Sequence, residues 1–269
     1  MLLDGKKLLI TGVVTTDSIA HAAAAAAQRH GADIVLTTFE RDRERTEVAA
    51  TQLPAPAPIL ELDVTQESHF ERLTVQVGEQ WGRLDGALHA VAFAPRSALA
   101  GDFLAAGAEA TQAAFHTSAY SYAALGRVLA QLAPPTGGSL VGVDFDAAGA
   151  WPVYNWMGVC KAALESVNRY MARDLGPRGI RSNLVAAGPL HTRAADGIPE
   201  FERLTQAWEA RSALAWDAHD PTTVADAICF LFSDLARAIT AEIVHVDGGF
   251  HAMAADLRPA PRVASPLVV

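Results

Sequence analysis

KLLITGVVTTDSIA, Lys7 to Ala20, is the stretch that decides the fold. It begins with a short apolar run typical of a buried β-strand, passes through a single glycine, Gly12, and reaches residues typical of a helix start. A strand, a glycine turn and a helix in this order form the first unit of a sheet that binds a dinucleotide. The complete fingerprint of such a turn contains three glycines, so this stretch is also compatible with an ordinary strand–helix connection.

The rest of the chain repeats this alternation. Helical patterns cover residues 18–30, 41–52, 66–81, 108–132, 154–175 and 221–234. The apolar runs between them predict strands at Lys7–Thr11, Asp33–Thr37, Ile59–Asp63, Leu84–Ala90, Ser139–Phe145, Arg181–Ala186 and Glu242–Val246. These runs are apolar on both faces, as buried parallel strands are. The sequence therefore predicts an α/β fold: a single-domain, Rossmann-like, doubly wound parallel sheet of about seven strands over residues 1–255, with helices on both faces.

Composition excludes several classes of function. The 269 residues carry a formal net charge of -9, which disfavours nucleic acid or an anionic membrane surface as a partner. The two cysteines, Cys160 and Cys229, lack metal-ligand spacing, and none of the nine histidines has such spacing either, so no metal site is expected. No stretch of about 18 apolar residues is present, so no membrane insertion is expected.

The two ends of the sequence give further expectations. The N-terminus runs directly into a strand and lacks the features of a signal peptide, which predicts a cytoplasmic protein. The C-terminal tail, residues 256–269, contains three prolines. We expect this tail to be extended and poorly ordered unless it docks on a neighbour.

The residues after the first and third strands predict a cofactor site. Asp17 or Ser18 begins the first helix, where free N–H groups and the helix dipole favour a pyrophosphate. A plain N-cap explains Ser18 equally well. Asp63 ends the third strand, where its carboxylate could accept a hydrogen bond from an adenine amino group or could cap the next helix.

The residues after the second strand bear on the choice of cofactor. Phe39 and Glu40 lie where an adenosine ribose would sit. An acid at this place disfavours a 2′-phosphate and therefore favours NADH over NADPH. Arg41 and Arg43 follow closely and weaken this inference.

YNWMGVCK, Tyr154 to Lys161, predicts the reaction chemistry. Many dehydrogenases carry tyrosine and lysine four residues apart, but here the residue four before Lys161 is Met157. In a helix, Tyr154 and Lys161 would share a face about 10 Å apart along the axis. A displaced hydroxyl suits conjugate reduction, in which hydride reaches a β-carbon and negative charge develops on an oxygen farther along. Alternatively, Tyr154 and Trp156 are core aromatics and Lys161 is a solvated cation.

These stretches together resemble the bacterial enoyl-acyl carrier protein reductases, a divergent branch of the short-chain dehydrogenases, and above all their mycobacterial members. The resemblance covers roughly residues 2–250. It is specific, because the Tyr–Lys spacing and the single-glycine loop separate this branch from ordinary dehydrogenases. The segments that carry it, besides that loop, are Val141–Gly176, His116–Ala123 and Arg181–Pro189.

The resemblance implies a homotetramer that uses NADH to reduce the trans-2 double bond of an enoyl thioester, carried by acyl carrier protein or CoA, in fatty acid biosynthesis. It implies that Tyr154 stabilises the enolate, that Lys161 holds the nicotinamide ribose and that Phe145 lies at the hydride path. The implied cofactor-binding residues are Gly12, Val14, Ser18, Ile19, Phe39, Asp63, Val64, Val91, Ala92, Lys161, Leu190 and Thr192. The implied substrate-binding residues are Tyr154, Met157, Trp151, Ile198, Phe201 and Trp208.

Four places depart from the family pattern, and at one of them Gly158 stands where the mycobacterial enzymes have threonine. Ala90-Val91-Ala92-Phe93 replaces the usual Ser-x-Gly-Phe, which puts cofactor affinity in doubt. Trp151 replaces a mycobacterial methionine, which predicts a narrower pocket. The helical segment 193–216, which would cover the acyl channel, is shorter than in the mycobacterial enzymes and predicts acyl chains of short to medium length. Its apolar stripe, Ile198, Phe201, Leu204 and Trp208, is also explained by core packing.

Two other functions stay open at this point. One is a reductase of the same fold that acts on a ketone or on an enone of secondary metabolism, although the missing four-apart tyrosine opposes a ketone substrate. The other is a non-catalytic NAD-binding homologue, which the altered turn at Ala90–Ala92 favours and the intact Tyr154 and Lys161 oppose.

Overall fold

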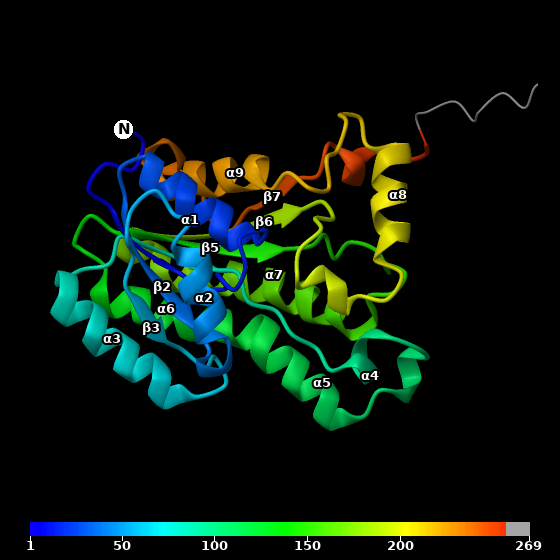
Figure 1. Cartoon of the computed structure of the whole chain (residues 1–269), viewed down its shortest axis with the longest axis horizontal. Helices are drawn as coiled ribbons and strands as arrows, with labels where there is room; N and C mark the ends of the chain where they lie inside the picture. Colours follow the sequence, from blue (N-terminus) through cyan, green and yellow to red (C-terminus); the bar gives the residue numbers. More distant parts are fainter. Residues whose placement is uncertain (257–269) are drawn as a thin grey trace, which may run out of the picture.

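A computed structural model describes residues 1–256, so the predicted tail lies outside the described residues except for Asp256. Within the described residues, one sheet of seven parallel strands has the order β3-β2-β1-β4-β5-β6-β7 (Figure 1). The predicted parallel sheet is confirmed, and each predicted strand end lies within two residues of the observed one. The strands are β1 Lys7–Ile10, β2 Asp33–Thr38, β3 Ile59–Glu61, β4 Gly86–His89, β5 Gly138–Asp144, β6 Ile180–Ala187 and β7 Ile243–Val246.

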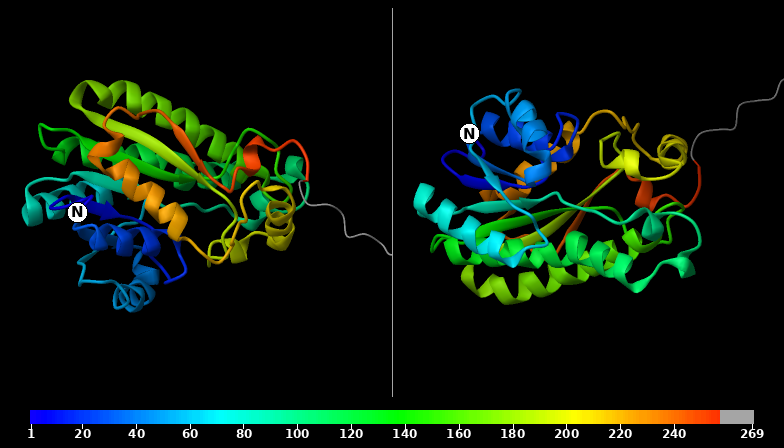
Figure 2. Two further views of the ribbon diagram at one scale, coloured as in Figure 1. Left: turned by 90° about the horizontal axis from the view of Figure 1, so that it is seen from above. Right: turned by 60° about the horizontal axis from the view of Figure 1, so that its bottom comes forward.

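Helices cover both faces of the sheet (Figure 2). Helices α1 and α9 pack on one face, and α3, α6 and α7 pack on the other. None of the helices within residues 1–256 is long and apolar enough to cross a membrane. The helices are α1 Ile19–Arg29, α2 Arg43–Ala50, α3 Glu67–Trp81, α4 Arg96–Leu99, α5 Ala108–Phe115, α6 Ser121–Leu132, α7 Asn155–Leu175, α8 Phe201–Arg211 and α9 Thr222–Phe232.

The central strands explain why the apolar runs lack a polar face. Successive side chains of a strand point to opposite faces of the sheet. In β1, Leu8 and Ile10 enter the core under α1 and α9, whereas Leu9 enters the core under α3 and α6. All three are fully buried. A Leu9→Ala exchange would therefore cost about 2–5 kcal/mol of stability.

The predicted helix 108–132 is interrupted, which the sequence did not indicate. A π-helical turn, His116–Tyr120, separates α5 from α6. Such turns are rare and occur frequently at functional sites. This one places Ser118 against the loop after β4, where its Oγ accepts from Phe93 N and donates to Phe93 O, both at 3.0 Å. The turn therefore fixes the loop that follows β4.

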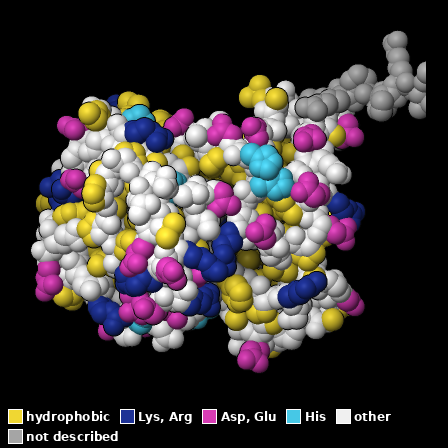
Figure 3. Space-filling model, viewed as in Figure 1, with side chains coloured by type: hydrophobic (Ala, Val, Ile, Leu, Met, Phe, Trp, Pro, Cys, Tyr) yellow, Lys and Arg dark blue, Asp and Glu magenta, His cyan; other side chains and the backbone are white. Residues whose placement is uncertain are grey.

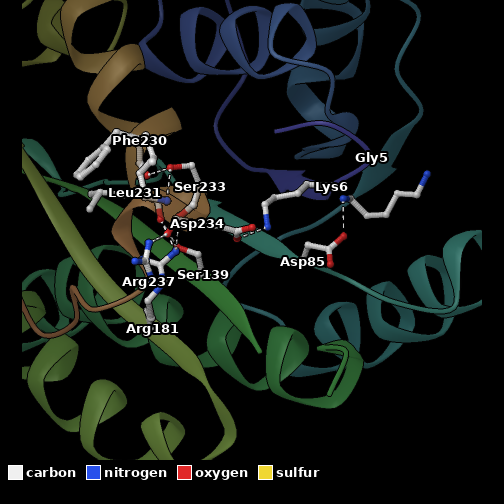
Figure 4. A network of polar contacts seen from close by, with 12 residues as sticks. Gly5, Lys6, Asp85, Ser139, Arg181, Phe230, Leu231, Ser233, Asp234 and Arg237 are labelled. Carbon is white, nitrogen blue, oxygen red and sulfur yellow. Dashed lines mark hydrogen bonds and ion pairs between the residues drawn. The ribbon is translucent and has the colours of Figure 1, made fainter. Parts of the chain in front are cut away.

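A polar network closes the amino edge of the sheet (Figure 4). The Arg181 guanidinium donates to Leu231 O at 2.6 Å and to Ser233 O at 3.3 Å, at the C-terminal end of α9. These carbonyls have no partner inside the helix, so the arginine satisfies them. Lys6 Nζ adds an ion pair with Asp234 Oδ1 at 2.9 Å. This edge is thus tied down, while the loops at the opposite edge form the candidate site.

Candidate active site

Most of the predicted cofactor residues lie in loops that meet at one edge of the sheet, whereas Ile19 and Lys161 lie on α1 and α7. Because all the strands are parallel, the loops at their carboxyl ends share that edge, where ligands bind in open α/β sheets. Each of the first six strands supplies at least one predicted residue. They are Gly12 and Val14 after β1, Phe39 after β2, Asp63 and Val64 after β3, Val91 and Ala92 after β4, Phe145 after β5, and Leu190 and Thr192 after β6.

Gly12 lies where the order of the strands reverses, between the neighbours β1 and β4. Its φ is +86°, in the region that favours glycine. A Cβ at this position would lie 2.1 Å from Ala90 O. Glycine is therefore required so that two loops can approach each other at the sheet's crevice.

We expect a Gly12→Ala exchange to weaken NADH binding by at least about tenfold, because the loops after β1 and β4 must move apart. The matched control is Gly5→Ala. Gly5 also has a positive φ, +68°, but nothing lies within 4 Å of a Cβ built there. Both variants should lose stability through backbone strain, and only Gly12→Ala should lose affinity in a fluorescence titration with NADH. Equal affinities for the two variants would contradict this account.

Ser18 and Asp63 both make the local contacts of capping residues. Ser18 Oγ accepts from His21 N at 3.1 Å and donates to Thr15 O at 2.8 Å, so it is the N-cap of α1. Asp63 Oδ1 accepts from Thr65 N at 2.9 Å and from Thr65 Oγ1 at 2.7 Å, just before α3. The hydroxyl proton of Ser18 is thus engaged inside the loop. Thr15 Oγ1, by contrast, is buried without a hydrogen-bond partner among the described residues.

The arginines after β2 are already paired. Arg43 contacts Glu40 at 3.3 Å, and Arg45 contacts Asp42 at 3.2 Å. The guanidinium of Arg41 lies 4.9 Å from the ring centroid of Phe39. Basic and acidic side chains accordingly lie side by side over α2 (Figure 3). A 2′-phosphate would meet Glu40 and cations that already have partners, which favours NADH over NADPH.

Tyr154 precedes α7, which corrects the expectation that it shares a helical face with Lys161. The helix begins at Asn155, and Tyr154 is its N-cap residue. The flanking residues Val153 and Asn155 have positive φ values of 60° and 36°. Such a conformation costs about 1–3 kcal/mol for each residue, so the surrounding structure must hold the turn. Asn155 Nδ2 contributes by donating to Gly101 O at 3.1 Å.

Tyr154 and Lys161 are both buried, with 8% and 4% of their surface exposed. The alternative that Lys161 is a solvated cation is therefore wrong. Its Nζ donates to Val143 O at 2.8 Å and lies 3.9 Å from Asp144 Oδ1. Burial raises the pKa of Tyr154 above its usual value, so the phenol stays neutral.

Asp144 and His89 surround Lys161, and sequence reasoning missed both. Asp144 is 3% exposed, and neither of its carboxylate oxygens has a hydrogen-bond partner among the described residues. Burial raises the pKa of Asp144 to about 7, although Lys161 opposes this shift. Burial and the nearby Lys161 lower the pKa of His89 to about 3, so its ring is neutral. An acid inside the apolar run VGVDF was the available signal for Asp144.

Asp144 gives the fold a stability that decreases as the pH rises. Its pKa in the folded protein, about 7, exceeds the ordinary value of 3.8. Between these values the folded protein holds a proton that the unfolded chain releases, so the free energy of unfolding falls with rising pH. The asparagine side chain of Asp144→Asn does not titrate. We therefore expect the free energy of unfolding of this variant, relative to wild type, to rise by on the order of 3 kcal/mol from about pH 4 to about pH 8.

Urea unfolding over this pH range measures the gain of Asp144→Asn. Asp146→Asn, the next acid along the chain, is the control and should keep the pH dependence of the wild type. A constant stability difference between Asp144→Asn and wild type across the range would contradict the expectation.

An aromatic cluster adjoins Tyr154 and contains several predicted substrate residues. The ring centroid of Phe145 lies 5.0 Å from that of Tyr154, 5.2 Å from that of Trp151 and 5.6 Å from that of Trp208. Trp208 belongs to α8, whose Leu204 is also buried. Phe250, which follows β7, stacks on Trp208 at 3.7 Å. Sequence reasoning missed Phe250, although it follows a strand whose end lies at the same edge.

The remaining predicted substrate residues divide into two groups. Met157 is buried in one apolar cluster with Tyr154, and Ile198 packs against that cluster. Ile198 precedes α8 and is therefore not part of the helical stripe. Phe201 does not join the cluster, because its ring contacts that of His191 at 5.3 Å. The structure thus brings five of the six predicted substrate residues together.

Similarity to known proteins identifies the family. The family model described as Enoyl-(Acyl carrier protein) reductase matches residues 12–251. The chain belongs to this family. Enoyl-[acyl-carrier-protein] reductase [NADH] of Mycolicibacterium smegmatis is 43% identical over 263 residues, which cover 92% of this chain and 97% of that protein. The enzyme of the same name from Mycobacterium avium is 43% identical over 262 residues, with the same coverage. The Escherichia coli enzyme is 36% identical over 251 residues, which cover 92% of this chain and 95% of that protein.

The turn that departs from the reductase pattern, Ala90–Ala92, is held by neighbouring side chains. Thr11 Oγ1 accepts from Ala90 N at 3.0 Å and donates to Leu88 O at 2.9 Å. Phe93 is bound on its backbone by Ser118, as described above. The loop is therefore fixed at both ends without the serine and glycine of the reductase pattern.

Proposed function

We propose that the protein is an NADH-dependent enoyl-acyl carrier protein reductase, which reduces the trans-2 double bond of an enoyl thioester in fatty acid biosynthesis. One observation carries the proposal: in a chain of this family, a buried neutral Tyr154 contacts Phe145, and a buried Lys161 binds Val143 O, both at the carboxyl end of β5. The reductases named above, with which the chain shares most of its length, support the choice of NADH.

The residues at the sheet edge fit NADH. The N-terminus of α1 offers free N–H groups to a pyrophosphate, and the unpartnered Thr15 Oγ1 supplies a donor in the loop before it. The backbone carbonyl of Val143 accepts one hydrogen bond from the Lys161 ammonium group. An ammonium group has three donors, so others stay available for the ribose hydroxyls. When bound, NADH supplies the hydride.

In this proposal the remaining predicted cofactor residues line the same edge of the sheet. Phe39, Asp63 and Val64 lie on the adenine side. Val14, Ser18 and Ile19 lie by the pyrophosphate. Val91 and Ala92 lie on the adenosine side, and Leu190 and Thr192 contact the nicotinamide half. These assignments rest on the family resemblance and on the position of each loop at the carboxyl edge.

Tyr154 acts in this proposal as a hydrogen-bond donor. Its hydroxyl donates to the thioester oxygen, on which negative charge develops when the β-carbon receives hydride. Its raised pKa keeps the proton on the phenol, so the group donates a hydrogen bond and does not ionise. Solvent protonates the α-carbon afterwards. The ring of Phe145 lies beside the reacting atoms in this proposal.

The proposal includes the surroundings of the site. Residues 1–255 form one dinucleotide-binding domain, in which segment 193–216 covers the acyl chain and favours short to medium lengths. The enzyme acts in the cytoplasm as a homotetramer. Large apolar side chains exposed on α5 and α7 support an interface between copies at that face: Phe115, Val159 and Tyr170.

The first experiment measures loss of NADH absorbance with purified protein and a panel of trans-2-enoyl thioesters, and repeats it with NADPH. Oxidation of NADH with at least one thioester, and slower oxidation of NADPH, is the expected result. Size-exclusion chromatography with light scattering tests the tetramer. Binding of NADH without oxidation by any thioester would contradict the proposed reaction and favour a non-catalytic homologue.

A further inference from the structure

Three segments that are distant in the sequence bring large aromatic side chains to one place. Trp151 comes from the loop after β5, Trp208 from α8 and Phe250 from the turn after β7. Trp151 lies 5.1 Å from Trp208 and 5.6 Å from Phe250 between ring centroids. Trp208 and Phe250 stack at 3.7 Å with an interplanar angle of 5°. We call these three residues the aromatic wall.

The aromatic wall is well packed. Trp208 is 1% exposed and Phe250 is 2% exposed. The guanidinium of Arg211 lies 3.8 Å from the ring centroid of Phe250 and adds a cation–π contact. Trp151 is fixed by its indole nitrogen, which donates to Asp146 O at 2.5 Å. The rings are therefore held by contacts from several elements of the fold.

The ring of Phe145 lies too close to those of Trp151 and Trp208 for a hydrocarbon chain to pass between them. Carbon atoms in van der Waals contact are about 3.5–4.0 Å apart, so a methylene chain between two rings needs about 7–8 Å. The centroid of Phe145 lies only 5.2 Å from that of Trp151 and 5.6 Å from that of Trp208. An acyl chain that starts beside Tyr154 and Phe145 and extends toward Trp151 or Trp208 cannot pass between these rings.

We propose that Trp151, Trp208 and Phe250 form the end of the acyl site and restrict the enzyme to enoyl thioesters with short acyl groups. This inference rests on the proposed function, because it concerns the acyl group of the same substrate. The indole nitrogen of Trp208 is buried without a hydrogen-bond partner among the described residues. Trp208 therefore contributes ring volume and no hydrogen bond, which makes it the residue to replace.

The experiment compares kcat/KM for trans-2-butenoyl and trans-2-dodecenoyl thioesters, with NADH in excess. Wild type should prefer the butenoyl substrate by at least about tenfold. Trp208→Leu removes the outer half of the ring and should shift the ratio toward the dodecenoyl substrate by at least about tenfold. Trp81→Leu is the matched control. Trp81 ends α3, outside the site, and its replacement should leave the ratio unchanged.

A second variant keeps the test decisive if Trp208→Leu does not fold, as judged by circular dichroism. Trp151→Met opens the same space from the other side and should shift the ratio in the same direction. A wild-type preference for the dodecenoyl substrate would overturn the aromatic wall while leaving the proposed function intact. An unchanged ratio in the folded variants would overturn it as well. Absence of NADH oxidation with every thioester would instead overturn the proposed function.

Discussion

The Tyr154→Phe variant is expected to lose about 10²–10³-fold in kcat for enoyl thioester reduction, with NADH affinity within about twofold of wild type. The exchange removes the hydroxyl that we propose donates to the developing negative charge, and it leaves the aromatic ring in place. The ring contact with Phe145, at 5.0 Å, is therefore preserved, and the stability of the fold should change little. Steady-state kinetics and a fluorescence titration with NADH measure the two quantities separately.

A matched control for Tyr154→Phe is available on α7, the helix that Tyr154 precedes. Tyr170 lies on α7 and is 59% exposed, so Tyr170→Phe removes a phenol hydroxyl without touching the site. It should leave kcat unchanged. A parallel loss of kcat and of NADH affinity in Tyr154→Phe would mean that the hydroxyl supports the cofactor and not the developing charge.

The Lys161→Ala variant should suffer two losses at once. NADH affinity should fall by at least about tenfold, because the ammonium group that we propose binds the ribose is gone. The free energy of unfolding should fall by about 3–5 kcal/mol near pH 8, since the buried Asp144 carboxylate then has no cation beside it. At lower pH this carboxyl takes up a proton, so the stability loss should shrink as the pH falls toward about 5.

The double variant Asp144→Asn, Lys161→Ala separates the two losses. A neutral amide needs no partner cation, so most of the stability should return. NADH affinity should stay low, because the ammonium group is still absent. Urea unfolding and NADH titration on all four proteins complete the cycle. Recovery of NADH affinity in the double variant would show that Lys161 acts on the fold and not on the cofactor.

The sheet was predictable because its signal is local. Each strand is a short apolar run buried on both faces, and each helix has its own periodicity, so no contact between distant residues was needed. The ends of elements were less certain. Strand β3 stops at Glu61 and not at Asp63, because Asp63 turns back to bind Thr65. Such capping contacts compete with the strand within one or two residues.

The site was predictable only where spacing or resemblance carried the information. Tyr154 and Lys161 could be found in the sequence because they are seven residues apart, which differs from the spacing in many dehydrogenases. Phe250 and His89 do not, because they reach the site through the arrangement of strands that are far apart in sequence. The positive φ values beside Tyr154 were also hidden, since valine gives no sign of a left-handed backbone. These features depend on tertiary contacts that hold the chain against its local preference.

The π-helical turn at His116–Tyr120 determines which side chains of α6 face the sheet. Each residue of an α-helix turns the chain by about 100°. A π turn contains one residue more than an α turn, so α6 is rotated by about that angle relative to a continuous helix from α5. In the observed phase Tyr122 faces the sheet and its hydroxyl lies 2.8 Å from Ser182 Oγ. Losing a single residue from the turn would rotate α6 by about 100° and turn Tyr122 away from the sheet, even with every other residue of the helix unchanged.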